Sequence, residues 1–90
     1  MSQRDVKDFL DGISYDFGIG AESLARGMAV STEHATALLE QRKPITDEDA
    51  YRLSYVVGRS PNFWAQKSEL TPLAELPIDF AKMIKLVKMP

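Results

Sequence analysis

Residues 21–43, AESLARGMAVSTEHATALLEQRK, decide the fold of this chain. In the first half of this stretch apolar residues recur at helical spacing, at Leu24, Ala25 and Met28. The pattern stops over residues 29–31 and restarts in the second half, with one apolar face made of Ala35, Leu38 and Leu39. Two short helices joined by a three-residue turn are typical of a helix-turn-helix, although an ordinary αα-hairpin in a small bundle fits the same pattern.

The turn itself has suitable residues. Ser31 is placed to cap the second helix, because its hydroxyl can accept a hydrogen bond from an amide of the next turn. Val30 sits where a buried apolar side chain would fill the junction. Ala25 is small enough to let two helices meet at a steep angle. These features predict helices over residues 21–28 and 32–41.

The rest of the chain adds three helices. Apolar spacing predicts one over residues 4–17, with an inner face of Val6, Phe9, Leu10, Ile13 and Phe17. Thr46 and Ser60-Pro61 read as the starts of helices over residues 47–57 and 61–69. We therefore predict an all-α, five-helix domain in residues 1–70, followed by a C-terminal extension in residues 71–90.

The extension is open to two interpretations. Pro72 and Pro77 divide it into short pieces. Over residues 78–89 apolar side chains fall on one side, and Lys82, Lys85 and Lys88 fall on another. This spacing is typical of a final amphipathic helix, or of a strand that pairs only in an assembly. The lysine row is expected to be a solvated face, the alternative being a contact with nucleic acid or an acidic protein partner.

Composition limits the classes of protein. Ninety residues make one small domain, with 44% hydrophobic and 27% charged residues. The absence of cysteine excludes disulfides and fits a cytoplasmic protein. No apolar run has the length of a membrane span or a secretory signal. The net charge is −2 and the pI is about 5.3, whereas a dedicated nucleic-acid binder is more often basic.

The sequence shows no catalytic, metal-binding or phosphate-binding motif. His34 is the only histidine, so neither a transition-metal ligand set nor a Ser-His-Asp arrangement is legible. The segment Gly18-Ile19-Gly20 lacks the further glycine and preceding strand of a phosphate-binding loop. We predict no catalytic residues, no metal, no cofactor and no enzyme activity.

Residues 24–70 carry a family resemblance. The motifs are Leu24-Ala25, Val30-Ser31, Leu38-Leu39, the segment Arg42-Lys43-Pro44-Ile45-Thr46, and Gly58 followed by Ser60-Pro61-Asn62-Phe63-Trp64. With these motifs the chain resembles the XRE, or lambda-repressor-like, helix-turn-helix family, in its HigA-type antitoxin branch. The resemblance implies a five-helix lambda-repressor-like domain whose third helix reads duplex operator DNA, commonly as a homodimer. It also implies an antitoxin that represses its own operon and neutralises a RelE-like RNase toxin.

The resemblance assigns roles to particular residues. The DNA-binding set is Ser31, Thr32, Glu33, Thr36, Ala37, Arg42 and Lys43, and the implied dimer contact is Phe63 with Trp64. The chain departs from the family at Ala29, where glycine is usual. Its third helix also offers no Arg, Lys, Asn or Gln at the base-facing positions, although these types supply most base contacts.

Several of these residues have a plainer interpretation. Glu33 is expected to stabilise the helix dipole rather than to contact a base. Arg42 and Lys43 are expected to contact phosphate, the alternative being a solvated turn. His34 is expected on the helix surface or partly covered. Three arginines outside the loop, Arg26, Arg52 and Arg59, are expected to be solvated or in surface ion pairs.

Two functions follow from the sequence. The first is a DNA-binding transcriptional regulator of the HigA antitoxin type. The second is a degenerate helix-turn-helix domain that acts as a protein-interaction module without sequence-specific DNA binding. Family resemblance favours the first, and the composition of the third helix favours the second.

Overall fold

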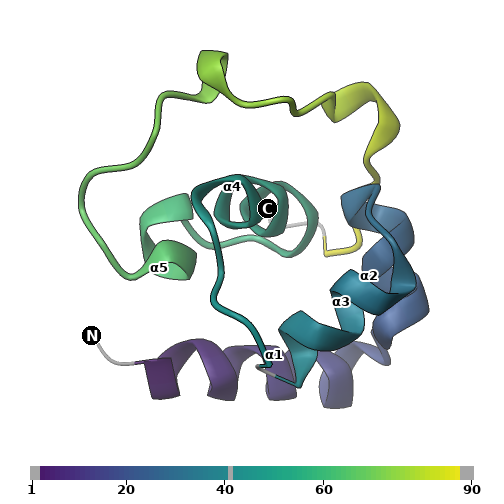
Figure 1. Ribbon diagram of the computed structural model, residues 1–90. Coiled ribbons are helices and arrows are strands. Elements are labelled where there is room, and N and C mark those ends of the chain that lie inside the picture. The colour runs from purple at the N-terminus through teal and green to yellow at the C-terminus, as the bar shows by residue number, and fades with distance from the viewer. Residues whose placement is uncertain (1–2, 41, 88–90) are drawn as a thin grey trace.

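The computed structural model describes residues 3–40 and 42–87 of the chain. Within these ranges the chain forms five α-helices, two short 3-10 helices and no strand. Figure 1 shows the elements, which in chain order are α1 (Gln3–Phe17), α2 (Ala21–Met28), α3 (Thr32–Leu39), α4 (Asp47–Val57), α5 (Pro61–Ala65), η1 (Leu73–Glu75) and η2 (Phe80–Lys82). The predicted all-α class with five helices is confirmed. Residue 41, the predicted end of the third helix, lies outside the described residues.

The starts of three helices are fixed by side-chain caps. In each case a hydroxyl oxygen accepts a hydrogen bond from the backbone N–H three residues later, at 3.1–3.2 Å. The capping residues are Ser31, Thr46 and Ser60. Each cap satisfies an amide that has no partner within its own helix, so the predicted helix starts are confirmed.

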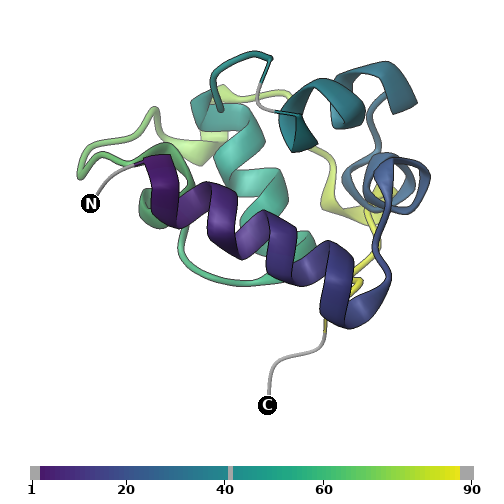
Figure 2. The same ribbon diagram turned by 90° about the horizontal axis from the view of Figure 1, so that it is seen from below.

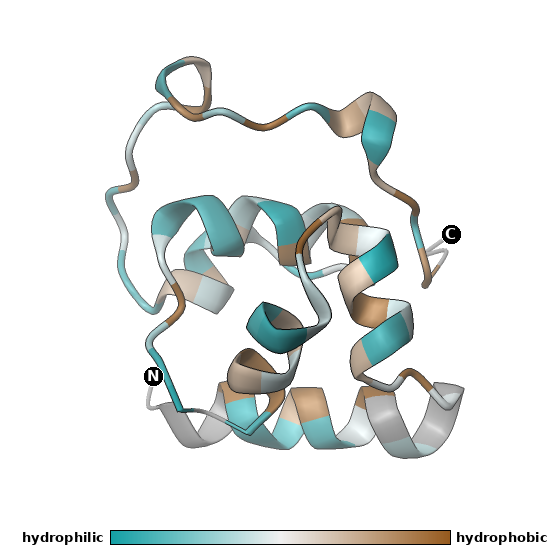
Figure 3. Cartoon of the chain, turned by 45° about the vertical axis from the view of Figure 1, so that its right-hand side comes forward, coloured by the Kyte–Doolittle hydropathy of each residue, from teal (hydrophilic) through white to brown (hydrophobic). Residues whose placement is uncertain are grey.

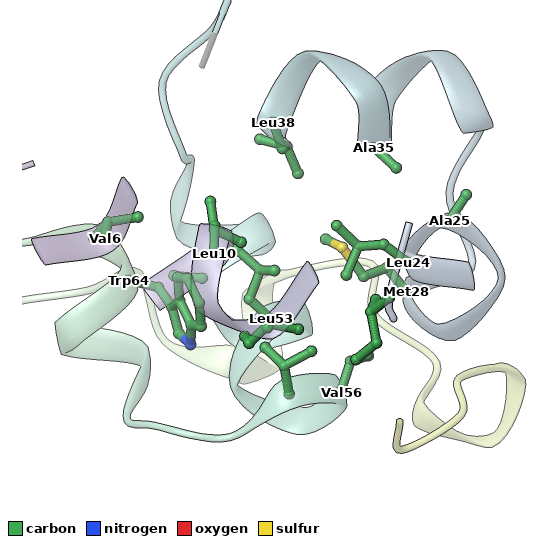
Figure 4. Close-up of a cluster of buried hydrophobic side chains, with 14 of the residues drawn as sticks. Val6, Leu10, Leu24, Ala25, Met28, Ala35, Leu38, Leu53, Val56 and Trp64 are labelled. Atoms are coloured by element: carbon green, nitrogen blue, oxygen red, sulfur yellow. The ribbon is translucent and has the colours of Figure 1, made fainter. Parts of the chain in front are cut away.

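Helix α4 lies at the centre of the domain (Figure 1). Its residues Ala50, Leu53 and Val56 have no exposed surface. Side chains from the other helices converge around them, as Figure 4 shows for Leu10, Leu24, Met28, Leu38 and Trp64. Burial of these apolar groups is the main stabilising contribution, at about 25 cal/mol for each Å² removed from water.

Helix α1 packs with the apolar face that its sequence predicts. Val6, Leu10 and Ile13 are buried, and the half-buried Phe9 packs against the same core. The side chain of Phe17 lies outside the described part of the structure. Figure 3 shows hydrophobic and hydrophilic residues alternating along α1 and α2, as expected for helices with one covered face.

Helix α5 is shorter than predicted, so the interpretation of residues 66–69 as helix is wrong. Gln66 takes left-handed backbone angles, with φ 58° and ψ 38°. The side-chain amide of Asn62 donates to the carbonyl oxygens of Lys67 and Ser68, at 3.1 and 2.8 Å. Asparagine bonds of this kind compete with helical backbone bonds, and here they hold the chain in a turn.

The segment after α5 takes neither conformation considered for residues 78–89. It runs in a wide arc from α5 towards α2 and returns towards α4 (Figure 1). Apart from η1 and η2 it forms no helix, and no strand occurs up to residue 87. Lys88 and Met89 lie outside the described residues.

Residues 83–87 of this segment dock on α2 and α4. The N–H of Ile84 donates to the Gly27 carbonyl at 2.9 Å, and the N–H of Leu86 donates to the Val56 carbonyl at 2.8 Å. Met83 is 6% exposed, whereas Ile84 is 48% exposed. Much of the apolar row in the extension therefore packs on its own domain.

Gly27 makes this docking possible. A Cβ atom at this position would lie 2.9 Å from Val56 Cγ1 and 3.0 Å from the Ile84 carbonyl oxygen. A methyl group could be accommodated here only if Val56 or the backbone at Ile84 shifted. The close approach of residues 83–87 to α2 is thus favoured by glycine at this position.

Candidate nucleic-acid interface

The α2–α3 pair has the geometry expected of a helix-turn-helix. Figure 2 looks nearly along the axis of α2 while α3 lies across the view, so the two axes cross steeply. Ala25 is 3% exposed at this junction, and half-buried Val30 packs against the core. Ala29, between the helices, has φ 59° and ψ 44°, the left-handed conformation for which glycine is favoured.

The N-terminal turn of α3 is exposed at the outer end of the motif. Ser31, Thr32 and Glu33 are all exposed. Thr36 is half-buried, and its hydroxyl donates to the Thr32 carbonyl at 2.8 Å. Four of the predicted DNA-binding residues therefore lie together at this end. Ala37, one turn after Glu33, is 7% exposed and adds little surface to this face.

His34 turns away from this exposed face. Its Nε2 atom lies 2.8 Å from Oδ1 of Asp49 in the first turn of α4. The two side chains are 25% and 4% exposed, and Asp49 Oδ2 has no hydrogen-bond partner. This pair joins α3 to α4 and holds the outer end of α3 against the core. The expectation for His34 is a helix-surface or partly covered position, and the structure shows it partly covered, but nothing in the spacing of residues 34 and 49 indicated the pair.

Arg42 and Lys43 are exposed in the loop between α3 and α4. Arg42 Nε lies 2.9 Å from Glu40 Oε1, and both side chains are more than half exposed. Exposed pairs of this kind contribute about 0–1 kcal/mol, so Arg42 can exchange Glu40 for another anion at little cost. Over residues 31–43, Glu33 and Glu40 balance the two cations.

Arg52 is buried, which corrects the expectation that it is solvated or in a surface ion pair. It is 8% exposed, and its guanidinium donates to the Met28 carbonyl at 2.6 Å and to the Pro77 carbonyl at 3.2 Å. It also bonds to Glu48 one turn earlier, at 3.2 Å. Arg52 thus joins the end of α2, helix α4 and the C-terminal segment. Because two partners are backbone carbonyls distant in sequence, no residue pattern could have indicated them.

Arg59 is exposed, but it is not simply solvated. Its guanidinium carbon lies 4.3 Å from the centre of the Phe63 ring, a cation–π distance. Phe63 and Trp64 are 6% and 1% exposed, and Trp64 Nε1 donates to the Gly58 carbonyl at 2.8 Å. Both aromatic rings pack in the core, so their role in a dimer contact stays a prediction.

Two other kinds of site are absent from the part of the chain that the structure describes. Within residues 3–40 and 42–87, no group of three or more His, Cys, Asp or Glu side chains is placed to hold a metal ion. In the same part of the chain no helix is long and apolar enough to cross a membrane.

The steep α2–α3 pair, with the first turn of α3 exposed, defines a helix-turn-helix domain. No family model matches the chain. The chain is similar to the uncharacterized HTH-type transcriptional regulator YddM of Escherichia coli (strain K12), with 30% identity over 74 residues. The match covers 80% of this chain and 79% of the relative. The protein therefore belongs to the family of HTH-type transcriptional regulators.

Proposed function

We propose that the protein is a DNA-binding transcriptional regulator of the HigA antitoxin type, which binds operator DNA as a homodimer with α3 in the major groove. The observation that carries this proposal is the exposure of Ser31, Thr32 and Glu33 at the start of α3. The His34–Asp49 pair fixes the opposite side of the same helix to α4. A recognition helix needs this arrangement, since its N-terminal residues contact base edges while its inner side is held by the domain.

Arg42 and Lys43 are the proposed phosphate contacts. Both are exposed in the loop that follows α3, and the Glu40 partner of Arg42 is held only by a solvated ion pair. Each phosphate contact that is lost should lower the slope of log affinity against log salt by about one. The double variant Arg42→Ala/Lys43→Ala should therefore reduce the slope by about two. The control Lys82→Ala/Lys85→Ala, which removes the same charge from the C-terminal segment, should leave the slope closer to that of the wild type.

The antitoxin role rests on the resemblance of residues 24–70 to the HigA-type branch of the XRE family. It predicts a cytoplasmic homodimer and a RelE-like RNase toxin encoded beside it. Because Phe63 and Trp64 are largely covered, their dimer contact would use their remaining edges together with neighbouring residues or the segment after Pro72. Co-purification with the product of an adjacent reading frame tests the toxin, and sedimentation at high micromolar concentration tests the dimer. A strict monomer would contradict the dimer.

A protein-interaction module is the second candidate. The observation in its favour is that the exposed first turn of α3 carries no Arg, Lys, Asn or Gln, while Glu33 and Glu40 add negative charge. Base readout depends mainly on those four residue types. Such a surface suits a protein partner better than it suits a specific base sequence.

Glu33→Gln distinguishes the two functions. In the regulator, this change removes a repulsion from phosphate and adds a donor that can reach adenine, so duplex binding should tighten. Folding should change little, because a dipole contribution of ~0.3–1 kcal/mol is the only term lost. Fluorescence anisotropy with the duplex upstream of the gene measures the first effect, and thermal unfolding measures the second. Glu75→Gln, an equal change of charge in η1, is the control and should leave duplex affinity closer to the wild-type value.

The two candidates give different outcomes. If neither the wild type nor Glu33→Gln binds any duplex above the non-specific background at low salt, the regulator proposal is wrong. Tighter binding of Glu33→Gln, together with an unchanged Glu75→Gln control, supports placement of α3 in the groove.

A further inference from the structure

The backbone carbonyls at the end of α2 are paired from two directions. The last four carbonyls of an α-helix have no partner within the helix and need one elsewhere. In α2 two of them accept N–H groups of the turn that follows the helix. The other two, on Gly27 and Met28, take their partners from distant parts of the chain.

The C-terminal segment supports both of these distant bonds, one directly and one through Arg52. The N–H of Ile84 donates to the Gly27 carbonyl at 2.9 Å. Nη1 of Arg52 donates to the Met28 carbonyl at 2.6 Å, and Nη2 donates to the Pro77 carbonyl at 3.2 Å. Because Arg52 is buried, release of Pro77 would leave a desolvated donor without its partner. Both bonds at the end of α2 therefore depend on the docking of residues 77–87.

The Met28 carbonyl lies where α2 passes into the turn of the helix-turn-helix. It belongs to the planar peptide group that joins Met28 to Ala29, whose backbone is left-handed. The bond from Arg52 thus fixes the direction in which the chain leaves α2. Asp49, three residues before Arg52 on the same side of α4, holds the start of α3 through His34 at 2.8 Å. One face of α4 therefore holds both ends of the turn.

We propose that Arg52 is a positioning residue for the recognition helix, and that docking of residues 77–87 controls duplex affinity through it. This inference rests on the proposed function, because it gives a consequence to the placement of α3 in the major groove. Arg52 is buried and so acts through the turn rather than by touching DNA. Undocking of the segment would loosen the turn, change the angle between α2 and α3, and weaken duplex binding while the helices remain folded.

A matched pair of variants at residue 84 tests the direct bond. Ile84→Pro removes the N–H that donates to Gly27, whereas Ile84→Ala keeps it and shortens a side chain that is 48% exposed. Met83 has φ −102° and ψ 157°, angles that suit a residue before proline. At a temperature where circular dichroism shows each variant fully folded, Ile84→Pro should bind the duplex upstream of the gene about tenfold more weakly than the wild type, and Ile84→Ala should stay within about twofold of it.

Arg52→Met tests the bond that runs through the guanidinium. Methionine fills a similar length without a hydrogen-bond donor, so duplex affinity should again fall about tenfold while the protein is fully folded. Adding Ile84→Pro to this variant should weaken binding by less than the product of the two single losses, because both changes release the same turn. A loss equal to that product would show that the two bonds act independently, and it would overturn the coupling.

Heteronuclear NMR of the free protein tests the same coupling without DNA. Ile84→Pro and Arg52→Met should both shift the amide signals of residues 29–32, whereas Ile84→Ala should leave these signals close to those of the wild type. Unchanged signals at residues 29–32 in both variants would overturn the proposal, and so would equal duplex affinities of Ile84→Pro and Ile84→Ala. If the wild type binds no duplex, the proposed function fails, and the NMR spectra decide whether the segment sets the turn.

Discussion

Replacing Ala29 by glycine should stabilise the domain. Ala29 ends α2 with φ 59° and ψ 44°. Its N–H donates to the Arg26 carbonyl at 3.3 Å, and the N–H of Val30 donates to the Ala25 carbonyl at 3.0 Å. These two bonds make a Schellman motif, which places residue 29 at the position where glycine is most favoured.

The expected gain is a difference of two terms. A residue with a Cβ atom in the left-handed region is destabilised by about 1–2 kcal/mol relative to glycine. Glycine in turn gives the unfolded chain more freedom, which lowers stability by about 0.4–1 kcal/mol. Ala29 is exposed, so loss of its methyl group removes little packing. The net stabilisation is about 0.5–1 kcal/mol, which raises the Tm of a domain of this size by about 2–8 °C.

Thermal and urea unfolding followed by circular dichroism measure this effect. Ala21→Gly is the control, because Ala21 is the first residue of α2 and has no need for a left-handed backbone. That variant should lower stability by up to about 1 kcal/mol. If Ala29→Gly is destabilised as much as Ala21→Gly, the left-handed conformation of residue 29 is refuted.

Three further changes test other contacts. His34→Ala leaves the buried carboxylate of Asp49 without its hydrogen bond and should lower the free energy of unfolding by about 2 kcal/mol. The double variant His34→Ala/Asp49→Ala should lose less unfolding free energy than the two single variants lose in sum. Gly27→Ala introduces short contacts with Val56 and Ile84, so it should lower the free energy of unfolding by on the order of 1 kcal/mol, although alanine has the better helix propensity. In the same urea titration the control Gly12→Ala should be stabilising, because a Cβ atom at residue 12 meets nothing within 4 Å. The hydrogen bond from Lys67, followed by those from the backbone and hydroxyl of Thr71, lowers the pKa of Asp47 from 3.8 to about 2. Ionised Asp47 therefore stabilises the fold above its unfolded-state pKa, and this contribution is lost as the pH falls from about 4 to about 2. In an acid titration Asp47→Asn should therefore lose stability less steeply than the wild type over that pH range.

Local signals made most of the fold predictable. Ser31, Thr46 and Ser60 cap helices where their sequence positions indicated, because capping depends on residues only three positions apart. Apolar spacing likewise identified the buried face of α1, at Val6 and Leu10 among others. Both signals lie within single helices and need no knowledge of tertiary packing.

The features that sequence reasoning missed depend on distant partners. Residues 83–87 take their conformation because Gly27 has no side chain to keep them away from α2, and because backbone carbonyls of α2 and α4 accept their N–H groups. Arg52 is buried because carbonyls at residues 28 and 77 receive its guanidinium. At the candidate interface, the family resemblance indicated Thr32 and Glu33, and the structure shows both residues exposed.

The docking of Ile84 on Gly27 has a consequence for the order of folding. The helix-turn-helix is built from contacts between neighbours in sequence, whereas this hydrogen bond joins residues separated by more than half of the chain. Loop closure over such a span is entropically costly, so contacts of this kind form late. We expect α2 and α3 to assemble first and residues 83–87 to join last. The amide of Ile84 should then exchange with solvent through a local opening that leaves the helices intact.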